Sequence, residues 1–532
     1  MIIENKSIEY QLNRDNTTTH SEYQISYEIV KAKMHCYSIK LRAIQTQRDL
    51  ENESQKEIMY SLRIVLRYIE ITYGSGIINS YRKNELTSDY QLIEHMLNII
   101  YSGRVKPEAH FLRRIYAVSR HGELKNNRRV FIDNGGHAKY LSILLSEIEP
   151  VERRLQASED VTEITCLKEL RNALREKYVK VIQSFNELAD PENPYHGIPA
   201  DITKFYFFQG KACTYQFVVN DREFQLVRHN NEKLIPDLFD VNNVMSSALS
   251  DYDGSIESYE KLNTLLSTLY GKLVSPVTIA IRENIQIFPD GLIVFLPFEM
   301  LLNEDGKYLI KRHSISYGHD HISDRIIPLP ATFQSRKEKF INPAYQLPGT
   351  EDEWSGTSFR ETPAILHIAA HQIMQKEEPV ILLSEKDSIF RTDFYKEEMP
   401  RSLLLSTCAG LEGLIVSGEG TKSFGMRAYE TGVENIISGL WSIDDYSSGR
   451  LIRNYMNRLL NGEDSDKSLR VSKIEFLEKS DRFHQHPIYW AAFIHYGNKI
   501  KIIRPLNDIL VIFLFLIPLL FSKTKIKISW WK

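Results

Sequence analysis

Two short apolar segments end at side chains that could carry out nucleophilic chemistry. His367 and His371 lie in the segment Ile-Leu-His-Ile-Ala-Ala-His-Gln at residues 365–372. Cys408 lies in the segment Ser-Leu-Leu-Leu-Ser-Thr-Cys-Ala-Gly at residues 402–410. Short apolar runs of this kind are typical of buried parallel strands, whose carboxyl ends meet at a sheet edge where ligands bind. A cysteine and a histidine at that edge could act as a thiolate nucleophile and a general acid/base.

The composition predicts an ordered protein of two or three domains that works in a reducing compartment. The chain has 532 residues, of which 42% are hydrophobic and 25% are charged. A net charge of −3 predicts no affinity for nucleic acid. The N-terminus has no uninterrupted apolar core of a secretory signal, so we expect a cytoplasmic location. The cysteines are too far apart for a disulfide framework or a zinc site, so we expect no metal and no cofactor. They are Cys36, Cys166, Cys213 and Cys408.

Residues 1–190 are predicted to form a helical domain. Six segments place apolar residues at three- and four-residue spacing. Antiparallel helix pairs stacked as in tetratricopeptide-like repeats fit this pattern, and so does an irregular helical bundle, because no repeat signature aligns cleanly. Either arrangement would offer a surface to a regulatory protein partner. The segments are 23–49, 54–73, 90–101, 108–119, 138–154 and 162–188.

Residues 200–500 are predicted to form an α/β domain with a mostly parallel central sheet flanked by helices. A linker at residues 191–199, with three prolines, separates it from the helical domain. Strand-like and helical segments then alternate, which is typical of parallel sheets covered on both faces. Asp290 and Gly291 lie between two apolar runs and predict a hairpin. The later strands are expected within 365–372, 402–410, 435–441 and 490–496.

Five motifs follow one another in this second domain. They are His367-Ile-Ala-Ala-His371, Leu405-Ser-Thr-Cys408, Ser417-Gly-Glu-Gly420, Gly439-Leu-Trp-Ser-Ile-Asp-Asp445 and His486-Pro-Ile-Tyr-Trp-Ala-Ala-Phe493. In order and approximate spacing they resemble the CHAT domain, a caspase-like cysteine peptidase domain related to separase and to the gingipain and caspase clan. The resemblance extends over residues 200–498. It implies a caspase-like fold and thiol protease activity without a cofactor.

The resemblance implies a catalytic dyad of Cys408 and His371. Cys408 would be the nucleophile, and His371 would protonate the leaving amine and then activate water. The backbone N–H groups of Cys408 and Gln372 are the candidate donors for the oxyanion. His367 is left as a strand residue with a structural hydrogen bond. The alternative for Cys408 is a buried core thiol, because a free cysteine behaves as a small hydrophobic residue.

Asp444 and Asp445 are candidates for substrate binding. In separase-like relatives the matching acidic position lies in the pocket for the side chain before the scissile bond, where a carboxylate would select arginine or lysine. Asp445 aligns with that position better than Asp444 does. Both aspartates also suit the N-cap of the helix that follows, so both roles stay open.

The C-terminal segment is predicted to be a membrane anchor at residues 506–522. Residues 509–521 form an unbroken run of thirteen apolar residues. As a helix this run would span about 20 Å, against a hydrocarbon core of roughly 30 Å. Flanking lysines and the pair Trp530-Trp531 are typical of a membrane interface. We therefore predict a short transmembrane helix that tethers the enzyme to the inner membrane; a buried helix is the alternative.

Together these features predict a cysteine endopeptidase that performs limited proteolysis and is regulated by its helical region. Some bacterial relatives in the family process gasdermin-like pore-forming proteins, so a protein of that kind is the candidate substrate. A catalytically silent CHAT-fold scaffold, which assembles partner proteins through the helical domain, is the alternative. A glutamine amidotransferase-like hydrolase is disfavoured because its histidine follows the cysteine in the chain, whereas His371 precedes Cys408.

Overall fold

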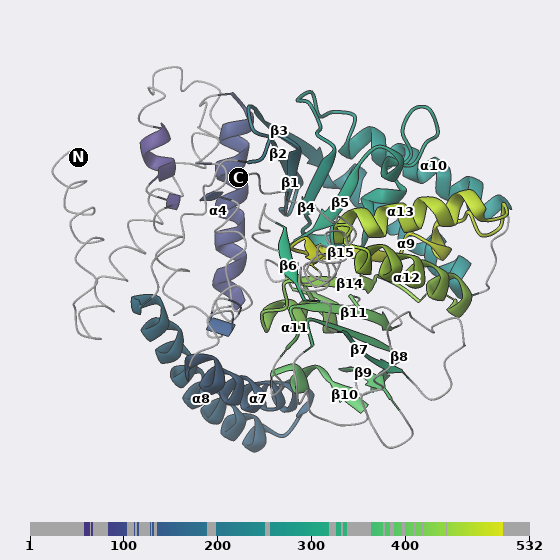
Figure 1. Cartoon of the computed structure of the whole chain (residues 1–532). Coiled ribbons are helices and arrows are strands. Elements are labelled where there is room, and N and C mark those ends of the chain that lie inside the picture. The colour runs from purple at the N-terminus through teal and green to yellow at the C-terminus, as the bar shows by residue number, and fades with distance from the viewer. Residues whose placement is uncertain are drawn as a thin grey trace, which may run out of the picture.

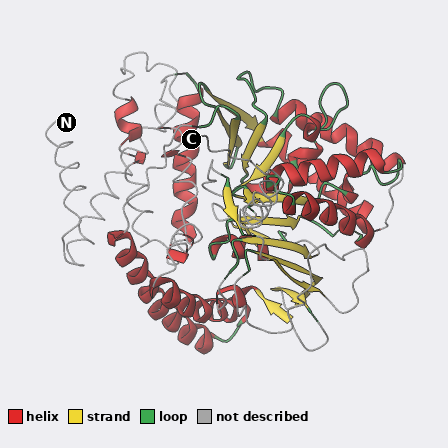
Figure 2. Cartoon of the chain, in the orientation of Figure 1, coloured by secondary structure: helices red, strands yellow, loops and turns green. Residues whose placement is uncertain are grey.

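A large sheet with helices on both faces dominates the structure (Figures 1 and 2). The structure is a computed structural model. It describes residues 58–63, 65–66, 83–103, 111, 114–115, 128, 130–131, 136–188, 198–250, 256–318, 326–330, 333–337, 363–375, 378–383, 388–395, 399–407, 410–411, 413–416, 420–442 and 444–503.

Twelve strands form the central sheet in the order β10-β9-β8-β11-β14-β15-β5-β4-β1-β2-β3, with β7 also paired to β8. Two smaller sheets pair β12 with β13 and β16 with β6. The strands are β1 (Ile202–Gln209), β2 (Cys213–Val219), β3 (Phe224–Asn230), β4 (Asn284–Phe288), β5 (Ser314–Tyr317), β6 (Ile327–Leu329), β7 (Phe333–Lys337), β8 (Ile365–Gln375), β9 (Glu378–Leu382), β10 (Ser388–Phe390), β11 (Ser402–Thr407), β12 (Leu414–Val416), β13 (Gly420–Lys422), β14 (Asn435–Gly439), β15 (Phe493–Gly497) and β16 (Ile500–Ile502).

The central sheet contains two parallel blocks that meet in one antiparallel pair, and antiparallel strands extend it at both ends. β1, β4, β5 and β15 run parallel to one another, and so do β7, β8, β11 and β14. β14 and β15 are antiparallel, so the carboxyl ends of the two blocks lie at opposite edges of the sheet. The sheet is therefore mixed, with the predicted parallel strands divided between two blocks of opposite direction. An apolar run marks a buried strand but carries no information about the direction in which that strand runs.

Helices pack on both faces of the sheet, as Figure 1 shows for α9, α10, α12 and α13 on one face and α4 on the other. β1 contributes to both faces, because successive side chains of a strand point in opposite directions. Phe205 and Phe207 join the main core with α9 and α10, whereas Phe208 packs in the cluster that contains α4. The helices are α4 (Lys83–Tyr101), α7 (Gly136–Ala157), α8 (Val161–Leu188), α9 (Asn231–Ser250), α10 (Ile256–Leu273), α11 (Phe424–Glu430), α12 (Asp445–Leu460) and α13 (Ser465–Lys479), with short 3-10 helices η1 (Gly291–Phe295), η2 (Phe298–Met300), η3 (Leu309–Lys311), η5 (Arg391–Tyr395) and η6 (Pro487–Tyr489).

One hydrophobic core joins the two parallel blocks. It includes Ile287 of β4 in the first block together with Leu403 of β11 and Ile437 of β14 in the second. The same cluster reaches from Phe205 to Ile502 along the chain. The two blocks therefore share one hydrophobic core, which lies within the region predicted as the domain of residues 200–500. The boundaries of that domain stay a prediction.

The predicted hairpin around Asp290 and Gly291 does not form, because the second apolar run folds into the 3-10 helix η1. Gly291 has a φ of 56°, which turns the chain at this point. Gln209, at the end of β1, forms hydrogen bonds with the residues on both sides of Gly291. Its backbone N–H donates to Asp290 Oδ2 at 2.8 Å, and its side-chain oxygen accepts from the N–H of Leu292 at 3.0 Å. These bonds direct the apolar run away from the sheet.

The helices α7 and α8 form a packed pair in the N-terminal region (Figure 1). They confirm the helices predicted at residues 138–154 and 162–188. Asp160 starts α8 by accepting a hydrogen bond from the N–H of Thr162 at 2.8 Å. The predicted helix at residues 23–49 lies outside the described residues. Whether the helices form a solenoid or a bundle stays a prediction.

The predicted membrane anchor at residues 506–522 also lies outside the described residues. Within the part of the chain that the structure describes, each helix is too short or too polar to cross a bilayer.

Candidate active site

The ends of β8 and β11 bring the two predicted catalytic segments together. The two strands are parallel neighbours, and their register pairs Thr407 with Ala370. His371 directly follows Ala370 in β8, and Cys408 directly follows Thr407 in the sequence. Residues 365–370 are buried, whereas the side chain of His371 is exposed. The imidazole therefore lies where the strand reaches solvent and where a substrate can approach it.

Cys408 itself lies outside the described residues, but the loop that follows it is described at Gly410 and Leu411. The N–H of Leu411 donates to the carbonyl of Gly439 at 3.0 Å. The N–H of Gly425 donates to the carbonyl of Gly410 at 2.9 Å. These bonds fasten the loop to the end of β14 on one side and to the first turn of α11 on the other.

Gly410 is required by close packing at this point. A Cβ atom there would lie 2.4 Å from Ser438 Oγ and 2.9 Å from Thr407 Oγ1, which are distances that real Cβ atoms do not show. Among the described glycines, Gly410 is not one with a positive φ. The glycine thus lets the loop lie directly against the ends of β11 and β14.

Two buried hydroxyl groups beside this loop were missed by the sequence reasoning. Thr407 Oγ1 and Ser438 Oγ are both buried, and neither has a hydrogen-bond partner among the described residues. Buried hydroxyl groups are normally hydrogen-bonded, so these two are available donors next to the candidate nucleophile loop. Serine and threonine are common in strands, and nothing in the sequence distinguishes these positions from ordinary strand residues.

His367 has the structural role expected of it. Its side chain is fully buried, and its Nε2 atom shares a hydrogen bond of 2.9 Å with Ser406 Oγ on β11. This bond links β8 to β11 at a position four residues before His371 along β8. It also leaves His371 as the histidine of this segment that solvent can reach.

The strand that carries His371 is longer than predicted. We expected it to end at residue 372, but β8 continues to Gln375 and pairs with β9 in antiparallel fashion. His371 lies opposite Leu382, and Gln372 lies opposite Ile381. The Gln372 side chain is half-buried. The proposed use of its N–H group for an oxyanion stays a prediction.

The two aspartates have different environments at the start of α12. Asp444 is the N-cap, and its Oδ1 atom accepts a hydrogen bond from the N–H of Ser447 at 3.0 Å. Asp445 is the first helical residue, and its side chain is exposed. The connection to β14 is fastened by Trp441, whose Nε1 donates to the carbonyl of Ile488 at 3.1 Å. The capping role that both residues could have played therefore belongs to Asp444, and Asp445 presents its carboxylate to solvent.

Metal chemistry has no candidate site in the described part of the chain, where no cluster of three or more histidine, cysteine, aspartate or glutamate side chains suits a metal ion. The described groups at the ends of β8, β11 and β14 include the exposed imidazole of His371 and the buried hydroxyls of Thr407 and Ser438.

The model of the CHAT domain family matches residues 330–498, a range that contains all the predicted site residues. Two solved structures with similarity are crystal structures of the Saccharomyces cerevisiae separase–securin complex. The first has a TM-score of 0.42 at 8% identity, covering 94% of this chain and 52% of that chain. The second has a TM-score of 0.37 at 8% identity, covering 93% and 51%. This chain thus spans about half the length of those proteins.

No curated protein matches the chain. The family match begins at residue 330, later than the start near residue 200 that we expected, although the strands before it belong to the same sheet. The resemblance to the CHAT domain is thus confirmed by the family match over residues 330–498.

Proposed function

We propose that this protein is a cysteine endopeptidase that cuts protein substrates through a dyad of Cys408 and His371. The observation that carries the proposal is the register of β8 and β11. It makes residues 371 and 408 the next positions after a paired Ala370 and Thr407 on neighbouring parallel strands. Consecutive Cα atoms are about 3.8 Å apart, so neither residue is far from the shared strand ends.

The proposed reaction follows from the two side chains. The thiolate of Cys408 attacks the carbonyl carbon of the scissile peptide bond, and His371 donates its proton to the leaving amine. A water molecule then gives its proton to His371 and attacks the thioester, which releases the acid product and restores the thiol. The exposure of His371 supports this role, because the imidazole must reach both the substrate amine and water.

The developing oxyanion needs hydrogen-bond donors. We assign this role to the backbone N–H groups of Cys408 and Gln372, which flank the shared strand ends in the sequence. One well-placed donor is worth about 2.7–4 kcal/mol in an acyl-transfer transition state. The short loop fastened at Gly410 supports this assignment, because it limits how far the chain around Cys408 can move.

Substrate preference is assigned to Asp445. Its carboxylate is exposed, and it begins α12, the helix that follows β14, which is paired with β11. Asp444 is already engaged as a helix cap, which makes it the weaker candidate. An exposed carboxylate would favour arginine or lysine before the scissile bond through a charge-assisted hydrogen bond.

The wider biological role rests on the sequence alone. A gasdermin-like protein substrate, a regulatory partner on the helical region and a tether at residues 506–522 remain predictions. A silent scaffold that assembles partners is the competing function, and the same experiment separates the two.

The test uses a set of short peptides that differ only in the residue before the cut, with arginine, lysine, alanine or glutamate at that position. We expect the intact protein to cleave the basic peptides, and Cys408→Ala and His371→Ala to be inactive at an unchanged melting temperature. Cys166→Ala is the matched control, because Cys166 is a described cysteine with an exposed side chain. Full turnover by Cys408→Ala would exclude the dyad, and no turnover of any peptide by the intact protein would favour the scaffold.

A further inference from the structure

The short helix α11 lies between the loop after Cys408 and the helical region. Figure 1 shows α7 and α8 at the end of the sheet that carries β9 and β10, close to α11. Contacts from both sides converge on this one helix. Its first turn holds the loop, and its last turn is held by residues from the N-terminal half of the chain.

Arg427 makes the central contact between α11 and α7. Its side chain is only 8% exposed and forms ion pairs with Glu149 of α7 and with Glu430 of α11, the latter at 2.6 Å. Its guanidinium group also lies 4.0 Å from the centre of the Tyr395 ring. The hydroxyl of Tyr395 donates to Glu430 at 3.1 Å, so Tyr395 contacts both Arg427 and Glu430.

Arg128, from the segment before α7, holds the other end of the helix. Its Nη1 atom donates to the carbonyl of Tyr429 and, at 2.9 Å, to the carbonyl of Val433. Its guanidinium group lies 3.8 Å from the centre of the Tyr429 ring. Cations are favoured at the last carbonyls of a helix, so this buried arginine fixes the end of α11 and the turn that enters β14.

The first turn of α11 touches the loop directly. Besides the bond from Gly425 to Gly410, a Cβ atom on Gly425 would lie 2.4 Å from Leu411 Cδ2, so the helix and the loop are in close contact. Thr421, just before α11, donates to the carbonyl of Leu411 at 3.0 Å. A shift of α11 would therefore move Gly410 and Leu411 with it, because packed interiors do not absorb displacement.

We propose that Arg427 and Arg128 are positioning residues for the peptidase site, which act through α11. The docked helical region holds α11, and α11 holds the loop after Cys408 in the geometry that attack requires. The α7–α8 region is in this sense a structural part of the site. This inference deepens the proposed function and rests on it for its catalytic consequence.

The physical argument concerns buried charge. Removing one member of a buried ion pair leaves its partner without compensation, so the surrounding structure must rearrange or admit water. Here the partners are Glu149 and Glu430, and the element that would rearrange is the seven-residue helix α11. A helix this short has little stability of its own and depends on its tertiary contacts.

The test compares Arg427→Met, Arg128→Met and Glu149→Gln in the full chain by two measurements. The first is hydrogen exchange at the N–H groups of Leu411 and Gly425, which does not depend on catalysis. The second is kcat and KM for a basic peptide. We expect exchange at both groups to rise about tenfold and kcat to fall about tenfold at a nearly unchanged KM. Arg427→Lys, which keeps the charge, should retain part of both properties.

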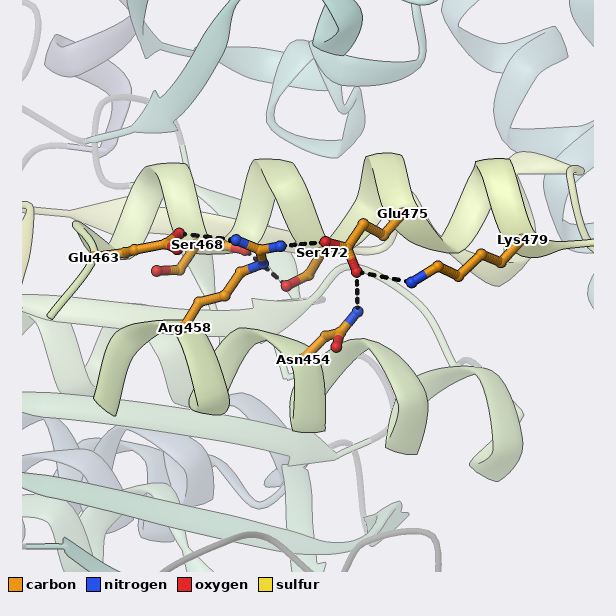
Figure 3. A network of polar contacts seen from close by, with 7 residues as sticks. All are labelled: Asn454, Arg458, Glu463, Ser468, Ser472, Glu475 and Lys479. Atoms are coloured by element: carbon orange, nitrogen blue, oxygen red, sulfur yellow. Dashed lines mark hydrogen bonds and ion pairs between the residues drawn. The ribbon is translucent and has the colours of Figure 1, made fainter. Parts of the chain in front are cut away.

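Arg458→Met is the matched control, because Arg458 also bridges two elements with ion pairs. It joins α12 to α13 through Glu475 and also pairs, at 2.9 Å, with Glu463 in the connection between the two helices, as Figure 3 shows. We expect this variant to lower the melting temperature without changing exchange at Leu411 or the value of kcat.

Unchanged exchange and kcat in a folded Arg427→Met variant would overturn the inference. If Arg427→Met does not fold, the milder Glu149→Gln variant decides in the same way. Faster exchange at Leu411 in a protein that cleaves no peptide would support the coupling through α11 and overturn the proposed function, so the two failures are distinguishable.

Discussion

The two parallel blocks of the sheet end in very different ways. At the end of β5, Tyr317 is buried and donates to Glu299, which forms an ion pair of 3.2 Å with Lys473 of α13. The side chains of Glu299 and Lys473 are only 4% and 1% exposed. At the end of the buried part of β8, by contrast, His371 is exposed.

The comparison explains why chemistry is expected at one edge only. Both edges carry polar side chains at the ends of buried strands. At the β5 edge, these side chains satisfy one another inside the core and contribute to stability. At the β8 edge, the side chain is left in reach of substrate, and the antiparallel pair of β14 and β15 keeps the two edges apart.

We call the β8 edge the open edge and the β5 edge the closed edge. The largest expected effect comes from removing the proposed reactive groups at the open edge. Cys408→Ala or His371→Ala should lower kcat for a basic peptide by at least about 10³-fold without changing the melting temperature. The matched change at the closed edge is Tyr317→Phe, which should lower the melting temperature and keep kcat. A large loss of kcat in Tyr317→Phe would show that the two edges are not functionally separate.

The next effect concerns the buried ion pair at the closed edge. Burial lowers the pKa of Lys473, while the neighbouring Glu299 favours its charged form. Lys473→Ala leaves the Glu299 carboxylate buried without its partner and should lower the free energy of unfolding by about 3–5 kcal/mol. The exposed pair of Arg154 and Glu163, at 2.6 Å, is the control, and Arg154→Ala should leave the free energy of unfolding, measured with urea, almost unchanged. Equal losses from both substitutions would contradict the description of a closed edge.

Three buried histidines extend the comparison with exposed His371. Burial lowers the pKa values of His229, His486 and His495 from 6.5 to about 4. Below pH 6.5 the unfolded chain binds protons at these sites more readily than the folded chain. Stability is therefore complete above pH 6.5 and falls as the pH drops toward 4.

Each of these histidines should cost about 2 kcal/mol of the free energy of unfolding between pH 7 and pH 5. His486→Gln removes one of them, so the loss measured by urea unfolding at the two pH values should shrink by about that amount. A loss of unchanged size in His486→Gln would contradict burial of this histidine as a cause of the pH dependence.

The smallest effect separates the two aspartates at the start of α12. Asp445→Asn should reduce the preference for arginine over alanine before the cut by about tenfold, because a charge-assisted hydrogen bond is lost. Asp444→Asn should instead lower stability slightly and keep the preference, because asparagine also caps helices. The ratio of kcat/KM values for the two peptides measures this. A loss of preference in Asp444→Asn alone would exchange the assignments.

The sequence predicted the elements that carry the site better than it predicted their surroundings. The strand expected within residues 402–410 forms at 402–407, and the N-cap that suited either aspartate is Asp444, because an apolar run and a capping aspartate are local signals. The structural role of His367 is confirmed as well. The exposed position of His371 follows from where its buried run ends.

The remaining features depend on contacts between distant residues. Gln209 holds the turn at the start of the 3-10 helix Gly291–Phe295 through two hydrogen bonds. The local hairpin signal at Asp290 and Gly291 carries no information about so distant a partner. Arg128 reaches the carbonyl of Tyr429 across 301 positions of the sequence. A single arginine in a charged helical region carries no sign of its partner.

The most direct measurement treats the protein with a peptide that ends in arginine and carries an acyloxymethyl ketone, a group that a thiolate displaces only when the peptide is bound. Peptide mapping by mass spectrometry then locates the adduct. The proposed site predicts one adduct per chain, on Cys408, and its loss in His371→Ala. An adduct spread equally over Cys408 and Cys166, or no adduct at all, would contradict the proposal that an activated thiol lies beside His371.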